Sequence, residues 1–349
     1  MKRRLIRSDL VNFEPYIPGE QPQDEGWIKL NTNENPYPPP LSVTEVLHNY
    51  PAESLRKYPD AVSTKVRESA GKVYKCDPGK IIVGNGSDEI LAMILRSTMD
   101  PGDKVSVFNP SYTLYKTLAY ANGGIPQEIH LTEDFSIPDI KPGDLGQIIF
   151  IPNPNSPTGT LFKQEQLEWL CENAPGVVVI DEAYAEFAGV SCIDWIDRYE
   201  NCIVTRTLSK SYALCGIRLG FGFAGEKLLR SLYAVKDSYN VNAITQAVGV
   251  AALEEDDYLK KVLSEVISER DVLSKELNER NFVVYPSYAN FILVDCPAPG
   301  AREIYENLKF RKILVRYFNV DRLDNSLRIT VGQPIENKAL LNALDEILS

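Results

Sequence analysis

Short apolar runs rich in valine and isoleucine recur along the first two thirds of the chain. Runs of this length and composition, without alternating polar residues, are typical of strands buried on both faces of a mostly parallel sheet. Helical patterns at 161–173 and 227–236 separate some of these runs, which favours strand–helix–strand units. The pattern therefore predicts a doubly wound α/β domain. Its predicted strands are Ile81–Val83, Lys104–Phe108, Gln147–Ile151, Val177–Ile180 and Cys202–Val204.

The last third of the chain follows a different pattern. A charged stretch from Glu254 opens a long helical pattern that runs to about Arg280, and we interpret its charges as a solvated helix face. Short strands and a closing helix follow. The predicted strands are Asn290–Val294, Ile313–Arg316 and Leu327–Val331. We predict a smaller α+β domain over these elements.

These patterns divide the chain into three parts. We expect a large domain over 41–245 and the small domain over 246–349. Residues 1–40 form a predicted arm, rich in proline from Pro15 to Pro40. We expect the arm to contribute to the small domain and to contact a second subunit.

Composition and charge narrow the classes of function. A chain of 349 residues with 44% hydrophobic and 24% charged residues is globular and long enough for two domains. A formal net charge of −11 argues against general binding to nucleic acid or to a membrane surface, since both need a basic footprint. An anionic substrate would therefore need a local arginine cluster.

The chain also shows no targeting segment and little material for a histidine-based zinc site. Its basic start, residues 1–7, is not followed by an apolar segment, so we expect no signal peptide, and no stretch reaches membrane-spanning length. The six cysteines are scattered without C-x-x-C spacing, which suits reduced thiols in the cytoplasm. Only His48 and His130 are present, so we expect no zinc site and no Ser-His-Asp triad.

The stretch from Thr207 to Arg218 carries the first candidate chemistry. Lys210 lies between two serines just after a predicted strand. A lysine kept away from water can lose its proton and attack a carbonyl, while Ser209 and Arg218 can hold a phosphate. Pyridoxal phosphate is the ligand that needs both an aldehyde-trapping lysine and a phosphate cradle. An ordinary solvated lysine is the alternative.

Two further strand ends carry residues that suit the same cofactor. Asp181 ends a predicted strand, where open α/β sheets bind ligands, and can pair with a protonated ring nitrogen. A helix cap or a magnesium ligand is the alternative reading. Tyr184 can reach the phenolic oxygen of the ring. The glycine-rich turn before Ser87 exposes backbone N–H groups at a helix start, which bind anions.

Alternatives remain at that glycine-rich turn. A dinucleotide fingerprint would need a third glycine where Glu89 stands. A plain helix-capping turn also fits Ser87 and Asp88.

Two loops after further strands complete the set. Asn155 or Ser156 can donate to the ring oxygen, and Tyr112 offers a flat surface for stacking. The convergence of these loops with the strand-end residues favours pyridoxal phosphate.

These residues resemble the fold-type I pyridoxal-phosphate aminotransferases, and most closely the histidinol-phosphate aminotransferase family. The resemblance covers nearly the whole chain. The segments that carry it are Leu30–Pro36, Arg56–Asp60, Asp181–Tyr184, Thr207–Lys210 and Leu327–Gly332.

The resemblance implies specific roles. Lys210 binds the cofactor aldehyde and acts as general acid and base, Asp181 meets the ring nitrogen, and Tyr184 and Tyr112 contact the ring. Asn155 takes the ring-oxygen contact, because Ser156 stands where much of the superfamily has asparagine. The phosphate would be held by Ser87 and Asp88 through the helix N-terminus, by Ser209 and Arg218, and by Tyr58 of the partner subunit. A homodimer with a shared active site follows.

The resemblance also implies the substrates. Arg316 and Arg328 match positions that bind anionic groups, with Tyr16 and Asn290 nearby, although such arginines can also be surface ion pairs. The implied reaction is reversible amino transfer between histidinol phosphate and 2-oxoglutarate in histidine biosynthesis, giving imidazole-acetol phosphate and glutamate. The alternatives are an aromatic-amino-acid aminotransferase, a threonine-phosphate decarboxylase and a non-catalytic cofactor-binding regulator.

Overall fold

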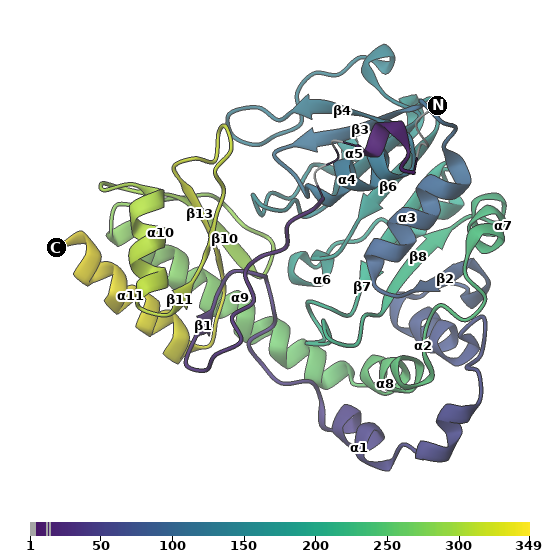
Figure 1. Cartoon of the computed structure of the whole chain (residues 1–349), viewed down its shortest axis with the longest axis horizontal. Coiled ribbons are helices and arrows are strands. Elements are labelled where there is room, and N and C mark those ends of the chain that lie inside the picture. Colours follow the sequence, from purple (N-terminus) through teal and green to yellow (C-terminus); the bar gives the residue numbers. More distant parts are fainter. Residues whose placement is uncertain (1–4, 12, 14) are drawn as a thin grey trace.

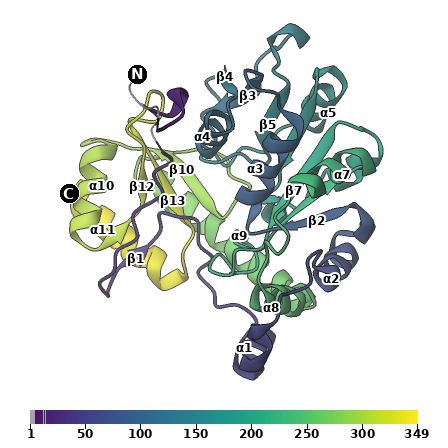
Figure 2. The same cartoon turned by 45° about the vertical axis from the view of Figure 1, so that its right-hand side comes forward.

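A computed structural model describes residues 5–11, 13 and 15–349. A large body contains one broad sheet, and a smaller body contains both the chain's last strands and its C-terminal helix (Figure 1). Helix α9 (Asp256–Glu279) runs along the small body and reaches toward the large one, as a second view also shows (Figure 2).

The large body contains a seven-stranded sheet with the strand order β2-β8-β7-β6-β5-β3-β4. Strand β8 is antiparallel to both neighbours, and the other neighbouring strands run parallel. The strands are β2 (Ile81–Gly84), β3 (Lys104–Asn109), β4 (Ile125–His130), β5 (Ile148–Pro152), β6 (Val177–Asp181), β7 (Cys202–Thr207) and β8 (Gly220–Ala224).

The five strands predicted from apolar runs are confirmed, but β4 and β8 were missed. Strand β4 lies at the sheet edge and is mostly exposed, so it lacks a continuous apolar run. Strand β8 is fully buried but alternates glycine with phenylalanine. A Cβ on Gly222 would lie 2.9 Å from the Ile90 side chain, so close packing of α3 explains this glycine.

Helices cover both faces of the sheet, because alternate residues of each buried strand belong to different cores. On β6, Val178 and Ile180 pack in one cluster with α2, α5 and α8, whereas Val177 and Val179 pack in another with α3, α4 and α7. This confirms the predicted doubly wound α/β class. The helices are α1 (Leu41–Asn49), α2 (Thr64–Tyr74), α3 (Ser87–Thr98), α4 (Leu114–Ala121), α5 (Gln164–Asn173), α6 (Ala185–Ala188), α7 (Glu226–Val235) and α8 (Ala243–Leu253).

The small body packs a second sheet against helices. Its four antiparallel strands have the order β12-β13-β10-β9, and α9, α10 and α11 contribute to its core. The predicted strand 313–316 is divided in two, because Ile313–Leu314 pairs with the arm and Arg316–Tyr317 with β13. The elements are β9 (Val283–Val284), β10 (Phe291–Asp295), α10 (Ala301–Phe310), β11 (Ile313–Leu314), β12 (Arg316–Tyr317), β13 (Ser326–Thr330) and α11 (Pro334–Leu348).

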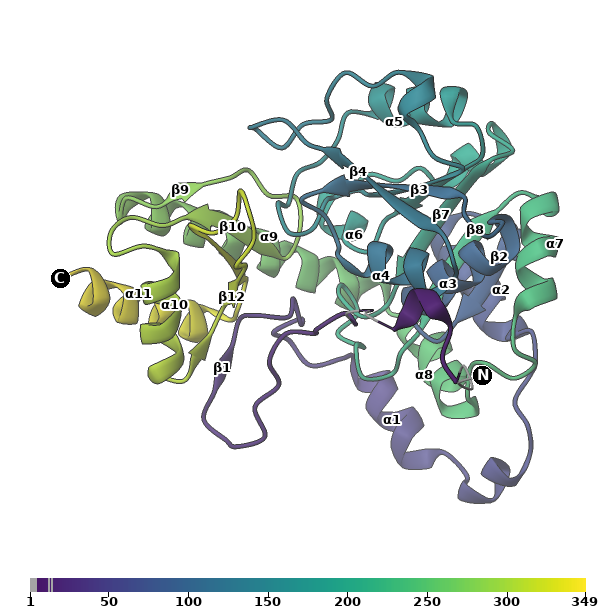
Figure 3. The same cartoon turned by 45° about the horizontal axis from the view of Figure 1, so that its top comes forward.

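The N-terminal arm joins the two bodies. Its strand β1 (Ile28–Lys29) pairs in parallel with β11, and the chain then returns to α1 beside the large body (Figure 3). Short 3-10 helices occur at Ser8–Leu10, Ala52–Arg56, Pro78–Lys80, Pro142–Asp144 and Ile193–Asp197. The arm thus passes the carboxyl ends of the central strands. The exact borders at 40 and 245 remain a prediction.

Candidate functional site

A cavity of about 240 Å³ opens where the ends of β5, β6 and β7 meet the arm and the small body. Eleven of the fourteen site residues predicted from the sequence line it. They are Tyr16, Ser87, Asp88, Tyr112, Asp181, Tyr184, Ser209, Lys210, Arg218, Arg316 and Arg328.

One end of the cavity is built as an anion cradle. Helix α3 begins at Ser87 without a side-chain cap, so its first N–H groups remain available. Arg218 lies 3.2 Å from the Asp88 carboxylate and donates to Ser209 Oγ at 3.5 Å. Gly86 has φ +82°, and a Cβ there would lie 2.5 Å from Arg218 Nη2, so only glycine allows this approach. The N–H groups of α3, the Ser209 hydroxyl and the Arg218 guanidinium, which is paired with Asp88, therefore converge on a space that suits a phosphate.

The Asp181 carboxylate lies at the end of β6 and is 4% exposed. The hydroxyl of Tyr115 donates to Oδ2 at 2.7 Å, and that of Thr205 donates to Oδ1 at 2.9 Å. Burial raises the pKa of Asp181, while these two hydrogen bonds oppose the rise. Within the described residues, Asp181 forms no ion pair, so its charge is available to a cationic ligand in the cavity.

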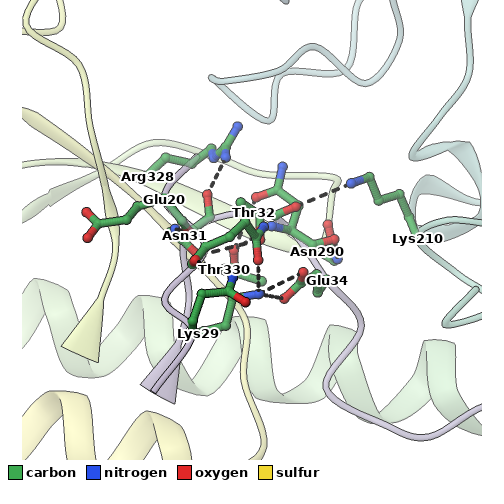
Figure 4. A network of polar contacts seen from close by, with 12 residues as sticks. Glu20, Lys29, Asn31, Thr32, Glu34, Lys210, Asn290, Arg328 and Thr330 are labelled. Carbon is green, nitrogen blue, oxygen red and sulfur yellow. Dashed lines mark hydrogen bonds and ion pairs between the residues drawn. The ribbon is translucent and has the colours of Figure 1, made fainter. Parts of the chain in front are cut away.

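Lys210 follows β7 and points toward the arm. Its Nζ donates to the Thr32 carbonyl at 3.3 Å (Figure 4) and lies 5.9 Å from the centre of the Tyr184 ring. The Tyr184 hydroxyl accepts a hydrogen bond from Asn33 Nδ2 at 2.8 Å. The lysine and the tyrosine predicted to act on the cofactor thus face one space, and the arm contacts both.

Tyr112 forms part of an aromatic wall. Its ring packs edge-on against Tyr16 and Tyr115, with centroid distances of 5.7 and 5.4 Å. Burial and the nearby Asp88 charge raise the pKa of Tyr112, so this phenol stays neutral. A neutral, fixed ring suits stacking on an aromatic ligand.

Arg328 lies on β13 at the opposite side of the cavity. Its Nη2 donates to the Asn31 carbonyl at 2.7 Å (Figure 4) and Nη1 donates to Ser156 Oγ at 3.3 Å, whereas the buried Nε has no partner. Burial lowers the pKa of Arg328, and Arg316 contributes in the same direction. No carboxylate in the described part of the chain pairs with Arg328. Arg316 and Arg328 both line this side of the cavity, and their guanidinium groups could hold an anionic ligand there.

Three predicted residues do not line the cavity. Asn290 is fully buried and donates to the Asn33 carbonyl at 3.1 Å, so it supports the arm. Tyr58 is 80% exposed and stacks on Tyr239 at 4.4 Å in a separate surface hollow. Its contact with a partner subunit's site stays a prediction.

The third, Asn155, requires a correction. Its side chain is buried behind the cavity, where Nδ2 donates to the Pro110 carbonyl and to Thr158 Oγ1. Ser156 lines the cavity instead. The expected ring-oxygen contact of Asn155 is therefore wrong, because its amide holds two loops together.

Sequence reasoning also missed residues that hold the site. Thr32 and Asn33 contact the lysine and Tyr184, and Tyr115 contacts Asp181. The polar run 31–35 between apolar residues was a usable signal, since buried asparagines need partners. Tyr115, three residues after Tyr112 and at the start of a helix, carried no comparable signal.

Comparison with known proteins places the chain among enzymes. A family model described as aminotransferase class I and II matches residues 25–344. A histidinol-phosphate aminotransferase from Microcystis aeruginosa is 42% identical over 347 residues, which cover 99% of each chain. One from Geotalea uraniireducens is 40% identical over 343 residues, covering 98% of this chain and 99% of the relative.

Solved structures share the fold over most of the chain. The histidinol-phosphate aminotransferase from Clostridium acetobutylicum has a TM-score of 0.83 at 25% identity, covering 92% of this chain and 98% of that one. The Sinorhizobium meliloti enzyme, in complex with pyridoxal-5'-phosphate, has a TM-score of 0.85 at 25% identity, covering 92% and 90%. By sequence and by fold, the chain belongs to the aminotransferase class I and II family.

Proposed function

We propose that this protein is a pyridoxal-phosphate-dependent histidinol-phosphate aminotransferase that uses 2-oxoglutarate and glutamate as the second substrate pair and serves histidine biosynthesis. The observation that carries the proposal is the buried Asp181 carboxylate, which has no cationic partner among the described residues and faces the cavity shared with Lys210. The names of the relatives support the choice of substrate.

The residues fit the cofactor's chemistry at both of its ends. The cradle of Ser87, Ser209 and Arg218 suits a phosphate, and Asp181 suits a protonated pyridine nitrogen. Tyr112 would stack on the ring, and Tyr184 would donate to its oxygen. Pyridoxal phosphate, when bound, supplies an electron sink that holds the amino group between the two half-reactions.

The chain's own residues would carry the proton transfers. Lys210 Nζ would take the proton from the substrate Cα as general base and then, as general acid, deliver it to the cofactor carbon that had carried the aldehyde oxygen. Asp181 would keep the ring nitrogen protonated, because its carboxylate is buried and has no cationic partner in the described part of the chain.

Arg328 and Arg316 would bind the anionic groups of both substrates. Forked guanidinium geometry suits carboxylate and phosphate alike, so one pair can serve glutamate and histidinol phosphate in turn. Tyr16 lies between this pair and Tyr112, and both arginines lower its pKa against the larger upward effect of burial.

We further propose a cytoplasmic homodimer in which Tyr58 of the partner subunit completes the phosphate site. The exposure of Tyr58 in a single chain supports a role at an interface. All six cysteines are unpaired, which supports a reducing compartment. No helix in the described part of the chain is long and apolar enough to cross a membrane.

Absorbance spectroscopy tests the proposal. The purified protein should carry bound pyridoxal phosphate, and glutamate alone should convert its spectrum to that of the amino form. Imidazole-acetol phosphate should then restore the original spectrum. Lys210→Ala should lose the lysine-dependent absorbance band and turnover, and normal turnover by this variant would exclude the scheme.

The same assay separates the alternatives. Faster conversion by an aromatic amino acid than by histidinol phosphate would favour the aromatic aminotransferase. Release of CO₂ from threonine phosphate would favour the decarboxylase. Bound cofactor without any reaction with glutamate would favour a non-catalytic regulator.

A further inference from the structure

Asn33 links the arm to Tyr184 through hydrogen bonds whose direction is fixed. The backbone N–H of Asn33 donates to Thr330 Oγ1 at 3.0 Å. The Thr330 hydroxyl, which accepts that bond, donates its own proton to Asn33 Oδ1 at 3.2 Å. With Oδ1 turned toward Thr330, the nitrogen of the planar amide faces Tyr184 and donates to its hydroxyl oxygen at 2.8 Å.

This direction determines where the Tyr184 proton can go. A hydroxyl that accepts from an N–H cannot donate to the same nitrogen, and no residue in the described part of the chain accepts from Tyr184. Tyr184 lines the cavity although it is only 8% exposed. Its proton is therefore available to a ligand atom inside the cavity.

Ser156 also lines the cavity near this loop. Its Oγ accepts from Arg328 at 3.3 Å, while the Asn155 amide lies behind the cavity. Tyr184 accepts a shorter bond, at 2.8 Å, from an amide that Thr330 orients in turn, so Tyr184 is the more firmly held of the two hydroxyl donors. Two cationic groups near Tyr184, Lys210 at 5.9 Å from the centre of its ring and Arg328, do not hydrogen-bond to its hydroxyl.

We propose that Asn33 is a positioning residue that aims the Tyr184 O–H at the ring oxygen of pyridoxal phosphate, with Thr330 fixing the orientation of the Asn33 amide. The inference rests on the proposed function, because the ring oxygen belongs to that cofactor. Asn33 is 2% exposed and has φ +55°, a conformation that asparagine tolerates better than most residues.

Thr330 also connects the two sides of the cavity. It lies two residues after Arg328 on β13, and the arm segment between Asn31 and Asn33 contacts both (Figure 4). The substrate-side strand and the cofactor-side tyrosine are therefore joined through one asparagine side chain.

Titration of the cofactor absorbance tests this role. A donor at the ring oxygen stabilises the negative charge that remains when the bound cofactor loses its proton. A misdirected donor should therefore raise the pH at which the cofactor, followed by its absorbance, is half deprotonated. In purified holoenzyme, Asn33→Gly should raise that midpoint by about 0.5, since one neutral hydrogen bond is weakened. Glycine keeps the positive φ without strain. Tyr184→Phe should raise it further.

The double variant distinguishes positioning from general damage. If Asn33 acts through Tyr184, Asn33→Gly should not move the midpoint further in a Tyr184→Phe background. Thr330→Val provides a second route, because it removes the hydroxyl that orients the amide, and it should shift the midpoint in the same direction. Asn337→Ala is the matched control, since Asn337 is buried and hydrogen-bonded to Gly332 but does not line the cavity.

The outcomes separate this inference from the proposed function. A wild-type protein without pyridoxal-phosphate absorbance would refute the proposed function. If the wild type titrates normally, equal midpoints for wild type, Asn33→Gly and Thr330→Val would overturn the role of Asn33. Equal shifts from Asn33→Gly with and without the Tyr184 hydroxyl would also overturn it, as would a matching shift in Asn337→Ala.

Discussion

The two sides of the cavity contain charges of opposite sign, the buried Asp181 carboxylate and the partly buried Arg328 guanidinium. On the cofactor side, burial raises the pKa of Asp181, and on the substrate side burial lowers the pKa of Arg328. Neither has an oppositely charged partner within the described residues. Holding either charge away from water without an ionic partner costs free energy of folding. Both groups are therefore placed to meet a charged ligand.

The two charges differ in how they are held. Both oxygens of Asp181 accept hydroxyl protons from residues anchored in the sheet body, Tyr115 and Thr205. Arg328 is held by the Asn31 carbonyl on the arm and by Ser156, and its Nε has no partner. A rigid, satisfied carboxylate suits a resident cofactor, whereas an incompletely satisfied guanidinium on a strand of the small body suits substrates that exchange.

The cofactor side should show the larger effect on the chemical step. Asp181→Asn keeps the shape of the side chain but removes the charge that stabilises a protonated ring nitrogen. We expect kcat to fall by about 100- to 1,000-fold with little change in KM. Stopped-flow measurement of the half-reaction with glutamate checks this. A variant that lost only substrate affinity would show that Asp181 lies on the substrate side of the cavity and not on the cofactor side.

The same substitution should stabilise the cofactor-free protein. Burial raises the pKa of Asp181, so folding favours the protonated form, and the ionised form lowers stability at every pH above that pKa. The penalty declines as the pH falls below the folded-state pKa and is gone below the unfolded-state pKa, and asparagine removes it at every pH. We expect the free energy of unfolding at pH 8 to rise by roughly 1 kcal/mol. Urea titration checks this, with exposed Asp139→Asn as the control that should not change.

The substrate side should show its effect in binding. Arg328→Gln removes a charged donor pair, so kcat/KM for glutamate and for histidinol phosphate should both fall by about 10- to 100-fold, chiefly through KM. Cofactor content and absorbance should stay normal. Arg302→Gln, an exposed arginine paired with Glu306 on α10, is the control expected to leave the kinetics unchanged. Loss for only one of the two substrates would show that they use different anion sites.

The fold was largely predictable because its central strands are continuous apolar runs. A strand buried on both faces can be recognised from its own apolar sequence. The exposed edge strand β4 and the glycine-containing β8 have no such run, and only their pairing with neighbouring strands identifies them. Gly220 shows this dependence, because a Cβ there would lie 2.4 Å from the backbone nitrogen of Ser87, a contact that sequence spacing cannot reveal.

The candidate site was predictable where its residues follow strands directly. Asp181 and Lys210 reach the cavity because parallel strands end at one edge of the sheet. Contacts between distant segments were not predictable, since Asn33 and Thr330 are 297 residues apart. The prediction for Asn155 did not hold for a related reason. Either of two adjacent polar residues could face the cavity, and only the loop geometry places Ser156 there.

A smaller effect should follow from weakening the support of Asp181. Tyr115→Phe keeps the stacking on Phe150 but removes the hydrogen bond that opposes the raised pKa of Asp181. We expect kcat to fall by about 3- to 10-fold with unchanged KM. Tyr120→Phe, in an exposed tyrosine, is the control. A change in KM without a change in kcat would argue that Tyr115 acts on the substrate side.

The smallest effect should come from the contact between Ser156 and Arg328. Ser156→Ala removes the acceptor for Nη1 but leaves the Asn31 carbonyl in place, so Arg328 keeps its position with one contact fewer. We expect KM for glutamate to rise about two- to threefold at constant kcat, measured beside Ser238→Ala as an exposed control. A fall in kcat at constant KM would instead group Ser156 with the residues that act on the cofactor. In that case Ser156 would act on the cofactor although it contacts Arg328, and Arg328 itself would lie between the cofactor and the substrate.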